Sequence, residues 1–104
     1  MATKSYFHVN AAVGATVISP NSGAIFGGVF INIAASAATS SVLTIFDAAT
    51  AGQATAANTV AVINVQNNTV PGFEYSAVMS RGLAYSYVQT GAVTTVGDFT
   101  ITFQ

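Results

Sequence analysis

Hydrophobic residues alternate with polar or small residues along most of this chain, with a period of two. In residues 98–103, DFTITF, the side chains of Phe99, Ile101 and Phe103 alternate with two threonines. Successive side chains of a β-strand point to opposite faces of a sheet, so this period predicts a strand. Residues 83–88, LAYSYV, show the same alternation with a leucine and two tyrosines. These two segments are the clearest predicted strands.

Six further segments have strand character, although both of their faces are partly apolar. Short stretches rich in Gly, Pro, Asn and Ser, which are typical of turns, separate most of them. The segments are SYFHV (5–9), ATVI (15–18), GAIFGGVFINI (23–33), SVLTIFD (41–47), TVAVINVQ (59–66) and FEYSAVM (73–79). About eight short strands at regular spacing predict an all-β fold, a sandwich or a barrel. Of these we expect an antiparallel β-sandwich.

The alternation also predicts which side chains lie between the two packed sheets. In GAIFGGVFINI, strict alternation places Ile25, Val29 and Ile31 on one face and Phe26 and Phe30 on the other. We expect the isoleucine face to be buried and the two phenylalanines to point outward. The predicted core consists of Ile25, Val29, Ile31, Leu43, Ile45, Ile63, Val65, Phe99, Ile101 and Phe103.

Two alanine-rich stretches, AASAA (34–38) and DAATAGQATAA (47–57), favour helix by composition. Each is short and interrupted, and neither has an apolar stripe at a spacing of 3.6 residues. We therefore predict loops with at most a turn of helix. No repeat or linker divides the 104 residues, so we expect a single domain. Within it, residues 1–20 would form an N-terminal arm with the first strand or strands, and residues 21–104 the sandwich.

Composition narrows the possible functions. Charged residues make up 5% of the chain and hydrophobic residues 52%, whereas soluble domains ordinarily have about 25% charged residues. The net charge is −1, and only Lys4 and Arg81 are basic apart from the histidine, so we expect no nucleic-acid partner. Exposed apolar patches usually mark protein contacts. We therefore expect an obligate oligomer or a part of a larger assembly.

Cysteine is absent, which excludes disulfides and thiolate metal sites. The N-terminal residues lack the charged and continuous apolar regions of a signal peptide, so we expect synthesis in a cytoplasm. The longest apolar stretch, residues 23–38, is interrupted by Asn32 and Ser36 and is shorter than the roughly 20 residues of a membrane span. We expect no contact with a membrane.

Groups able to carry catalysis are few: one histidine, His8, and three carboxylates. A catalytic or metal site needs several such groups in one concave place. We interpret His8 as an exposed or interface residue, with a metal ligand shared around a symmetry axis as the alternative. Glu74 and Asp98 are interpreted as solvated charges at strand starts rather than as an acid–base pair. We predict no enzyme activity, no metal and no cofactor.

Two further features have more than one interpretation. The glycine pair in FGGVF (26–30) indicates a bulge or a close crossing of strands rather than a phosphate loop, because no P-loop pattern or helix follows. Tyr85 and Tyr87 would serve core packing, a subunit interface or an aromatic platform for a sugar.

The order of segments from residue 23 to residue 103 resembles the small all-β virion proteins of tailed bacteriophages, of the capsid decoration (cement) and head-fibre type. The similar parts are a Gly-rich strand (GAIFGGVFINI), a strand ending in Asp (LTIFD), an Ala/Thr/Gly loop, a strand (VAVINV), a turn and strand (PGFEY), a hairpin (RGLAYSYVQTGA) and a terminal FTITF. The resemblance implies a jelly-roll-like sandwich that oligomerises on the outer capsid surface and adds contacts between major capsid subunits.

We therefore expect a structural virion protein whose partners are the major capsid protein and further copies of itself, most simply in a trimer. The N-terminal arm, which includes Lys4 and lies outside the similar region, is expected to contact the capsid shell. The expected interface residues are Tyr6, Phe7, His8, Phe26 and Phe30.

A receptor- or glycan-binding tip domain of a phage head or tail fibre is the alternative function. In that case Tyr85, Tyr87, Asn67 and Asn68 would contact a sugar. A hydrolase that uses zinc or carboxylates is a third possibility. Co-purification with empty capsids would favour decoration, and binding to a host polysaccharide would favour the tip domain.

Overall fold

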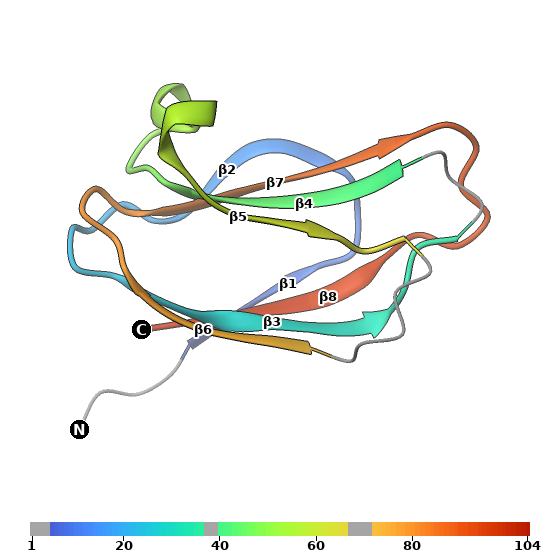
Figure 1. Ribbon diagram of the computed structural model, residues 1–104, viewed down its shortest axis with the longest axis horizontal. Helices are drawn as coiled ribbons and strands as arrows, with labels where there is room; N and C mark the ends of the chain where they lie inside the picture. Colours follow the sequence, from blue (N-terminus) through green and yellow to red (C-terminus); the bar gives the residue numbers. More distant parts are fainter. Residues whose placement is uncertain (1–4, 37–39, 67–71) are drawn as a thin grey trace.

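The computed structural model describes residues 5–36, 40–66 and 72–104 (Figure 1). Within these ranges the chain forms eight β-strands in two antiparallel four-stranded sheets that pack against each other. The predicted all-β sandwich of about eight short strands is thus confirmed. The strands are β1 (Ser5–Val9), β2 (Val13–Ser19), β3 (Ile25–Ile33), β4 (Ser40–Asp47), β5 (Thr59–Asn64), β6 (Gly72–Val78), β7 (Leu83–Thr90) and β8 (Asp98–Phe103).

The strands follow a nested pairing. Sheet A has the order β1-β8-β3-β6, and sheet B has the order β2-β7-β4-β5. The first strand pairs with the last, the second with the seventh, the third with the sixth and the fourth with the fifth. The chain is therefore a long two-stranded ribbon rolled up so that β3 also pairs with β8 and β4 with β7. This is the strand order of a jelly roll, the kind of sandwich that the resemblance implies.

The core between the sheets agrees largely with the alternation in the sequence. Tyr87, a central core residue, packs edge-on against Phe99 with ring centroids 4.7 Å apart. Its buried hydroxyl accepts hydrogen bonds from Gln89 Nε2 at 2.6 Å and from the Gly97 backbone N–H at 3.2 Å. Of the predicted core, Val29, Leu43, Ile45, Ile63, Val65, Phe99 and Ile101 are buried, and Ile31 and Phe103 are half-buried against it.

Strand β3 departs from strict alternation at Gly27 and Gly28. Its register with both neighbouring strands shifts between Phe26 and Gly28, which marks a β-bulge. Gly28 has a φ of 142°, and a Cβ there would collide with the backbone carbonyl oxygen of Phe73. The bulge exchanges the faces of the residues before it, so Phe26 is 0% exposed in the core and Ile25 faces outward. The predictions of a buried Ile25 and an outward Phe26 are wrong for this reason.

Strands β1 and β2 are parts of the sandwich. All of β1 pairs with β8, and β2 pairs with β7. Phe7 is half-buried and packs on Tyr85, with ring centroids 5.4 Å apart, and Val9 lies in the core. The structure therefore places residues 5–19 in the two sheets and their connection, rather than in an arm outside the sandwich. Lys4 lies outside the described residues.

The Ala/Thr/Gly loop between β4 and β5 folds over the outer face of sheet B (Figure 1). It contains two turns of 3-10 helix, η1 (Ala51–Gln53) and η2 (Ala56–Asn58), and no α-helix. Ala54 packs against a small cluster that contains Phe46 and Ala84. A loop with little helix is thus confirmed for this stretch. Within the described part of the chain, no helix is long and apolar enough to cross a membrane.

Candidate functional site

The outer face of sheet A carries three of the predicted interface residues. The strand register places His8, Thr100 and Phe30 in one row across β1, β8 and β3. Tyr6 lies in the next row, two residues along β1. Tyr6 is 74% exposed and Phe30 is 51% exposed, so both rings are accessible. Tyr6, His8 and Phe30 therefore share one face, whereas Phe7 and Phe26 point into the core.

Phe30 is half-exposed but fixed. A Cβ on Gly72, the residue opposite it in β6, would come within 2.9 Å of Phe30 Cδ1. One side of the ring thus packs on the backbone of β6 at Gly72, which has no side chain, and the rest of the ring is exposed to solvent. A ring held in this way loses little conformational freedom when a partner covers it.

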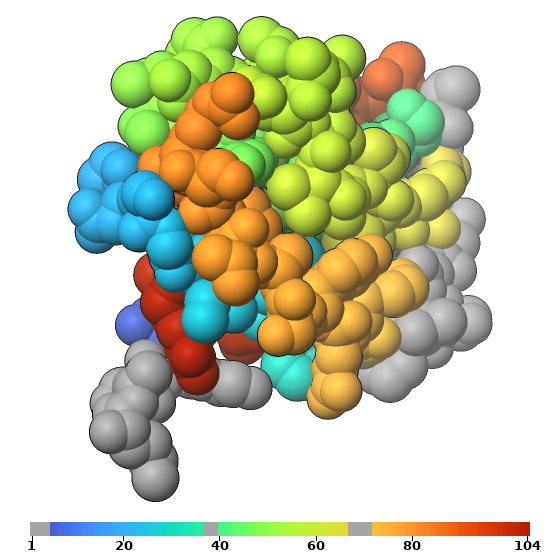
Figure 2. Space-filling view, turned by 60° about the vertical axis from the view of Figure 1, so that its left-hand side comes forward, coloured from blue at the N-terminus to red at the C-terminus, as the bar shows by residue number. Residues whose placement is uncertain are grey.

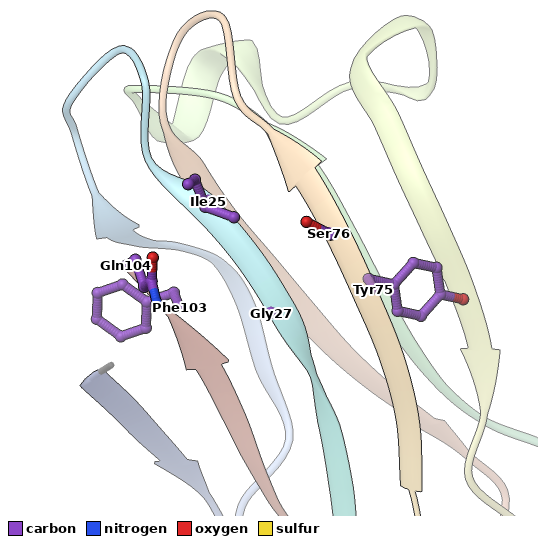
Figure 3. Close-up of a pocket in the computed structure, with 6 residues that line it drawn as sticks. All are labelled: Ile25, Gly27, Tyr75, Ser76, Phe103 and Gln104. Atoms are coloured by element: carbon purple, nitrogen blue, oxygen red, sulfur yellow. The ribbon is translucent and has the colours of Figure 1, made fainter. Parts of the chain in front are cut away.

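The β-bulge leaves a hollow of about 260 Å³ in this part of sheet A (Figure 3). A Cβ at Gly27 would come within 2.9 Å of Thr102 Oγ1, so the hollow depends on a glycine at this position. A second hollow, of about 230 Å³, is lined by Phe30 and Glu74 and shares Gly27 and Tyr75 with the first. The residues that line the first hollow are Ile25, Gly27, Tyr75, Ser76, Phe103 and Gln104. This uncharged lining suits an apolar side chain of a protein partner.

A polar cluster lies beside the aromatic rings and links β1, β3 and β8. Nε2 of His8 lies 2.7 Å from Oδ1 of Asp98 and donates to it in the tautomer that carries the proton there. Asn32 Nδ2 donates to Asp98 Oδ1 at 3.0 Å and to Thr100 Oγ1 at 3.2 Å. The sequence suggested that Asp98 is a solvated charge. In the structure its carboxylate also accepts hydrogen bonds from protein donors.

The environment of Asp98 favours its ionised form. The hydrogen bond from Asn32 lowers the pKa of Asp98, and the hydrogen bond and charge of His8 act in the same direction. Partial desolvation opposes them without cancelling the effect. No local pattern in the sequence signals this pair, because His8 and Asp98 are 90 residues apart and meet only through the pairing of β1 with β8.

The cluster does not amount to a metal or acid–base site. In residues 5–36, 40–66 and 72–104 there is no group of three or more His, Cys, Asp or Glu side chains that could hold a metal ion. Glu74 lies opposite Gly28, and Asp98 lies opposite Ile33, at the end of β3. The arrangement of Glu74 and Asp98 therefore does not support a pair of carboxylates acting on one substrate.

The alternative of a sugar platform does not fit the positions of Tyr85 and Tyr87. Tyr85 and Tyr87 are buried in the core, so neither ring is available for stacking on a sugar. Burial raises the pKa of Tyr85, and a hydrogen bond with Thr16 only partly offsets it. Core packing is the interpretation that holds for both tyrosines. Asn67 and Asn68 lie outside the described residues.

Asp47, at the end of β4, holds the turn between β6 and β7. Its carboxylate accepts backbone hydrogen bonds from Ser80 at 3.1 Å, Arg81 at 2.7 Å and Gly82 at 3.4 Å. Partial desolvation works against its ionisation, but these hydrogen bonds and the nearby Arg81 guanidinium together lower the pKa of Asp47. Asp47 therefore has a structural role at the end of the sandwich, away from the aromatic face.

Comparison with known proteins finds no matching protein-family model, and no curated protein or solved structure gives a significant match. A functional proposal for this chain must therefore start from its fold and from the surface chemistry of sheet A.

Proposed function

We propose that this protein is a non-catalytic structural protein that decorates the head of a tailed bacteriophage. In this proposal the outer face of sheet A binds the major capsid protein on the outer capsid surface, and copies of the chain associate with one another there. The observation that carries the proposal is the position of two accessible aromatic rings, Tyr6 and Phe30, on the same sheet face as an uncharged hollow. Such a surface is suited to a protein partner.

The energetics of the face also favour docking. Val78 lies opposite Ile25 on the same face and is 68% exposed, so apolar side chains extend beyond the two rings. Complete burial of a large apolar side chain contributes about 1.5–3 kcal/mol, and partial burial contributes a fraction of that. Many copies on a symmetric shell would multiply a modest affinity at each site.

The charge of Asp98 costs little on docking. Asp98 already accepts hydrogen bonds from Asn32 and His8, so a partner that covers it does not leave it without donors. Burying an unpaired charge would be strongly unfavourable. The polar cluster is therefore compatible with a docked state and needs no charged group from the partner.

The test is co-sedimentation with empty capsids assembled from the major capsid protein of the phage that encodes this chain. The wild-type protein should sediment with the capsids, and the double variant Tyr6→Ser/Phe30→Ser should lose most of its occupancy. Val88→Ser is the matched control, because Val88 is 53% exposed, close to the 51% of Phe30, but belongs to sheet B. Circular dichroism would verify that each variant keeps its strands.

Three outcomes would contradict the proposal. They are a wild-type protein that does not bind capsids, a double variant with unchanged occupancy, and an equal loss in Val88→Ser. Binding of the wild-type protein to host polysaccharide in place of capsids would favour a fibre tip domain instead.

A further inference from the structure

The sandwich has four edge strands, β1 and β6 in sheet A and β2 and β5 in sheet B. An edge strand presents a row of backbone N–H and C=O groups that a strand from another chain can pair with. Proteins prevent such pairing with short edge strands, charges, prolines or bulges. The four edges of this chain differ in these protections.

Three of the edges are protected. β1 has only five residues, and its His8 is engaged with Asp98. β2 has two register shifts against β7 and ends directly before Pro20. β6 carries the charge of Glu74 and is out of register with β3 around Gly27. Each of these features discourages a further strand from adding to that edge.

β5 has the fewest of these protections. Its sequence, TVAVIN, contains no charge, proline or glycine. Its ladder with β4 is continuous from Asn64 to Ala61, and the register shifts only beyond that point, towards Thr59. Val62 is 65% exposed, and Figure 2 shows the yellow-green atoms of β5 at the surface next to the orange atoms of β6.

The backbone of Val62 faces the open edge. The N–H of Val65 donates to the carbonyl of Ser41 at 2.9 Å, which makes this a hydrogen-bonded pair of the antiparallel ladder. Such pairs alternate with non-bonded ones, so Ile63 and Ala61 bond towards β4. The N–H and C=O groups of Val62 therefore point away from β4, on the side where sheet B has no further strand among the described residues.

We propose that β5 pairs with β5 of a second copy, antiparallel and centred on Val62, so that the two copies share one continuous sheet. Two copies of β5 can meet without placing like charges opposite each other, because the strand is uncharged. The same contact through β6 would bring two copies of Glu74 close together. The inference rests on the self-association within the proposed function and names the segment that provides it. It gives a two-fold contact, where the sequence suggested a trimer.

The outer faces of the two copies would also match. Val62 forms a row with Thr44 and Ser86 across β5, β4 and β7. The paired edge would continue this uncharged row into the second copy. Antiparallel pairing about a two-fold axis is self-complementary and closes at a dimer, which prevents open-ended growth along this edge.

Sedimentation equilibrium on three variants tests the contact. The wild type should form a dimer at tens of micromolar concentration, and Val62→Lys should weaken dimerisation at least about tenfold by placing two charges at the axis. Val78→Lys is the matched control, because Val78 is 68% exposed on edge strand β6 and should leave dimerisation unchanged. Val62→Pro should act like Val62→Lys, since proline removes only the outward N–H and is tolerated at a strand edge.

Cross-linking tests the register. The chain has no cysteine, so Val62→Cys introduces a single thiol. Opposite residues of a hydrogen-bonded antiparallel pair have Cα atoms about 5.5 Å apart, within the range that disulfides accept. Val62→Cys should therefore form a disulfide-linked dimer under mild oxidation. Val88→Cys, exposed on the same outer face of sheet B but on the inner strand β7, should not.

A wild-type protein that stays monomeric would overturn the inference, as would a Val62→Lys variant that dimerises unchanged. Cross-linking through position 88 but not 62 would also overturn it and would indicate face-to-face contact. A wild type that binds capsids but stays monomeric overturns this inference alone. A wild type that dimerises through β5 but does not bind capsids overturns the decoration proposal alone.

Discussion

The two sheets enclose one core but differ in the regularity of their central strand pairs. In sheet B, β4 pairs with β7 from Ser40 to Asp47 without a register shift. In sheet A, β3 shifts its register at the glycine pair and again near Ile33. Sheet B, whose central pair is regular, has an uncharged edge strand, whereas sheet A, whose central pair is interrupted, carries the hollow and the polar cluster. In this molecule the distinctive surface chemistry thus arises where the alternation of a strand is interrupted.

The largest expected effect tests the exchange of faces in β3. Phe26→Ala should lower the free energy of unfolding by about 3–5 kcal/mol, because Phe26 is fully buried. Phe30→Ala should cost about 1 kcal/mol or less, because half of its side chain is already in water. Urea denaturation measures both values. Strict alternation without a bulge would give the opposite ranking.

The next largest effect on stability is expected from replacing a glycine of sheet A, in contrast to a glycine of sheet B. Gly28→Ala in sheet A combines an unfavourable φ with a collision against the Phe73 carbonyl, and should cost about 3 kcal/mol. Gly14→Ala, in β2 of sheet B, meets no atom within 4 Å and has no positive φ. It should change stability by about 0.5 kcal/mol at most. Equal effects in urea denaturation would show that the bulge does not require glycine.

The smallest effects on stability are expected from replacing two carboxylates, Asp47 in sheet B and Asp98 in sheet A. Asp47→Ala removes the acceptor for three backbone N–H groups and should cost about 1–3 kcal/mol near neutral pH. Asp98→Ala removes interactions on an exposed face and should cost about 0–1 kcal/mol. Urea denaturation near neutral pH ranks the two variants.

Lowering the pH should remove the stabilisation that the ionised carboxylates of Asp47 and Asp98 provide. The pKa of each carboxyl is lowered in the folded protein, so its stabilising effect is complete above the unfolded pKa of about 3.9 and is lost as the pH falls through the lower folded value. The wild type should therefore lose more stability between about pH 7 and pH 3 than Asp47→Ala does. An unchanged acid sensitivity in Asp47→Ala would contradict the role assigned to Asp47.

The sequence predicted best those parts whose structure depends on local alternation. Leu43, Ile45 and Ile63 were expected in the core and lie there, because β4 and the inner part of β5 follow a strict period of two. Even the glycine pair was recognised as a bulge or a close crossing. Its effect on Phe26 and Ile25 was missed, because the bulge changes the side to which the preceding residues point.

Features that depend on the meeting of distant segments were not predictable. His8 and Asp98 have no local pattern that links them, since only the pairing of β1 with β8 brings them together. The composition of β5 was visible in the sequence as an uncharged strand. Its position at an edge of the sheet follows only from the order of strands in sheet B.

The nested pairing has a consequence for the order in which the chain folds. Among the eight described strands only β4 and β5 are both consecutive and paired, so this hairpin closes the shortest loop, whereas β1 must find a partner strand some 90 residues away. Closing a longer loop costs more entropy, and folds rich in distant pairings form slowly. During synthesis β1 emerges first, yet its place at the edge of sheet A exists only once β8 has been made. The first strand to be made is therefore among the last to reach its final position.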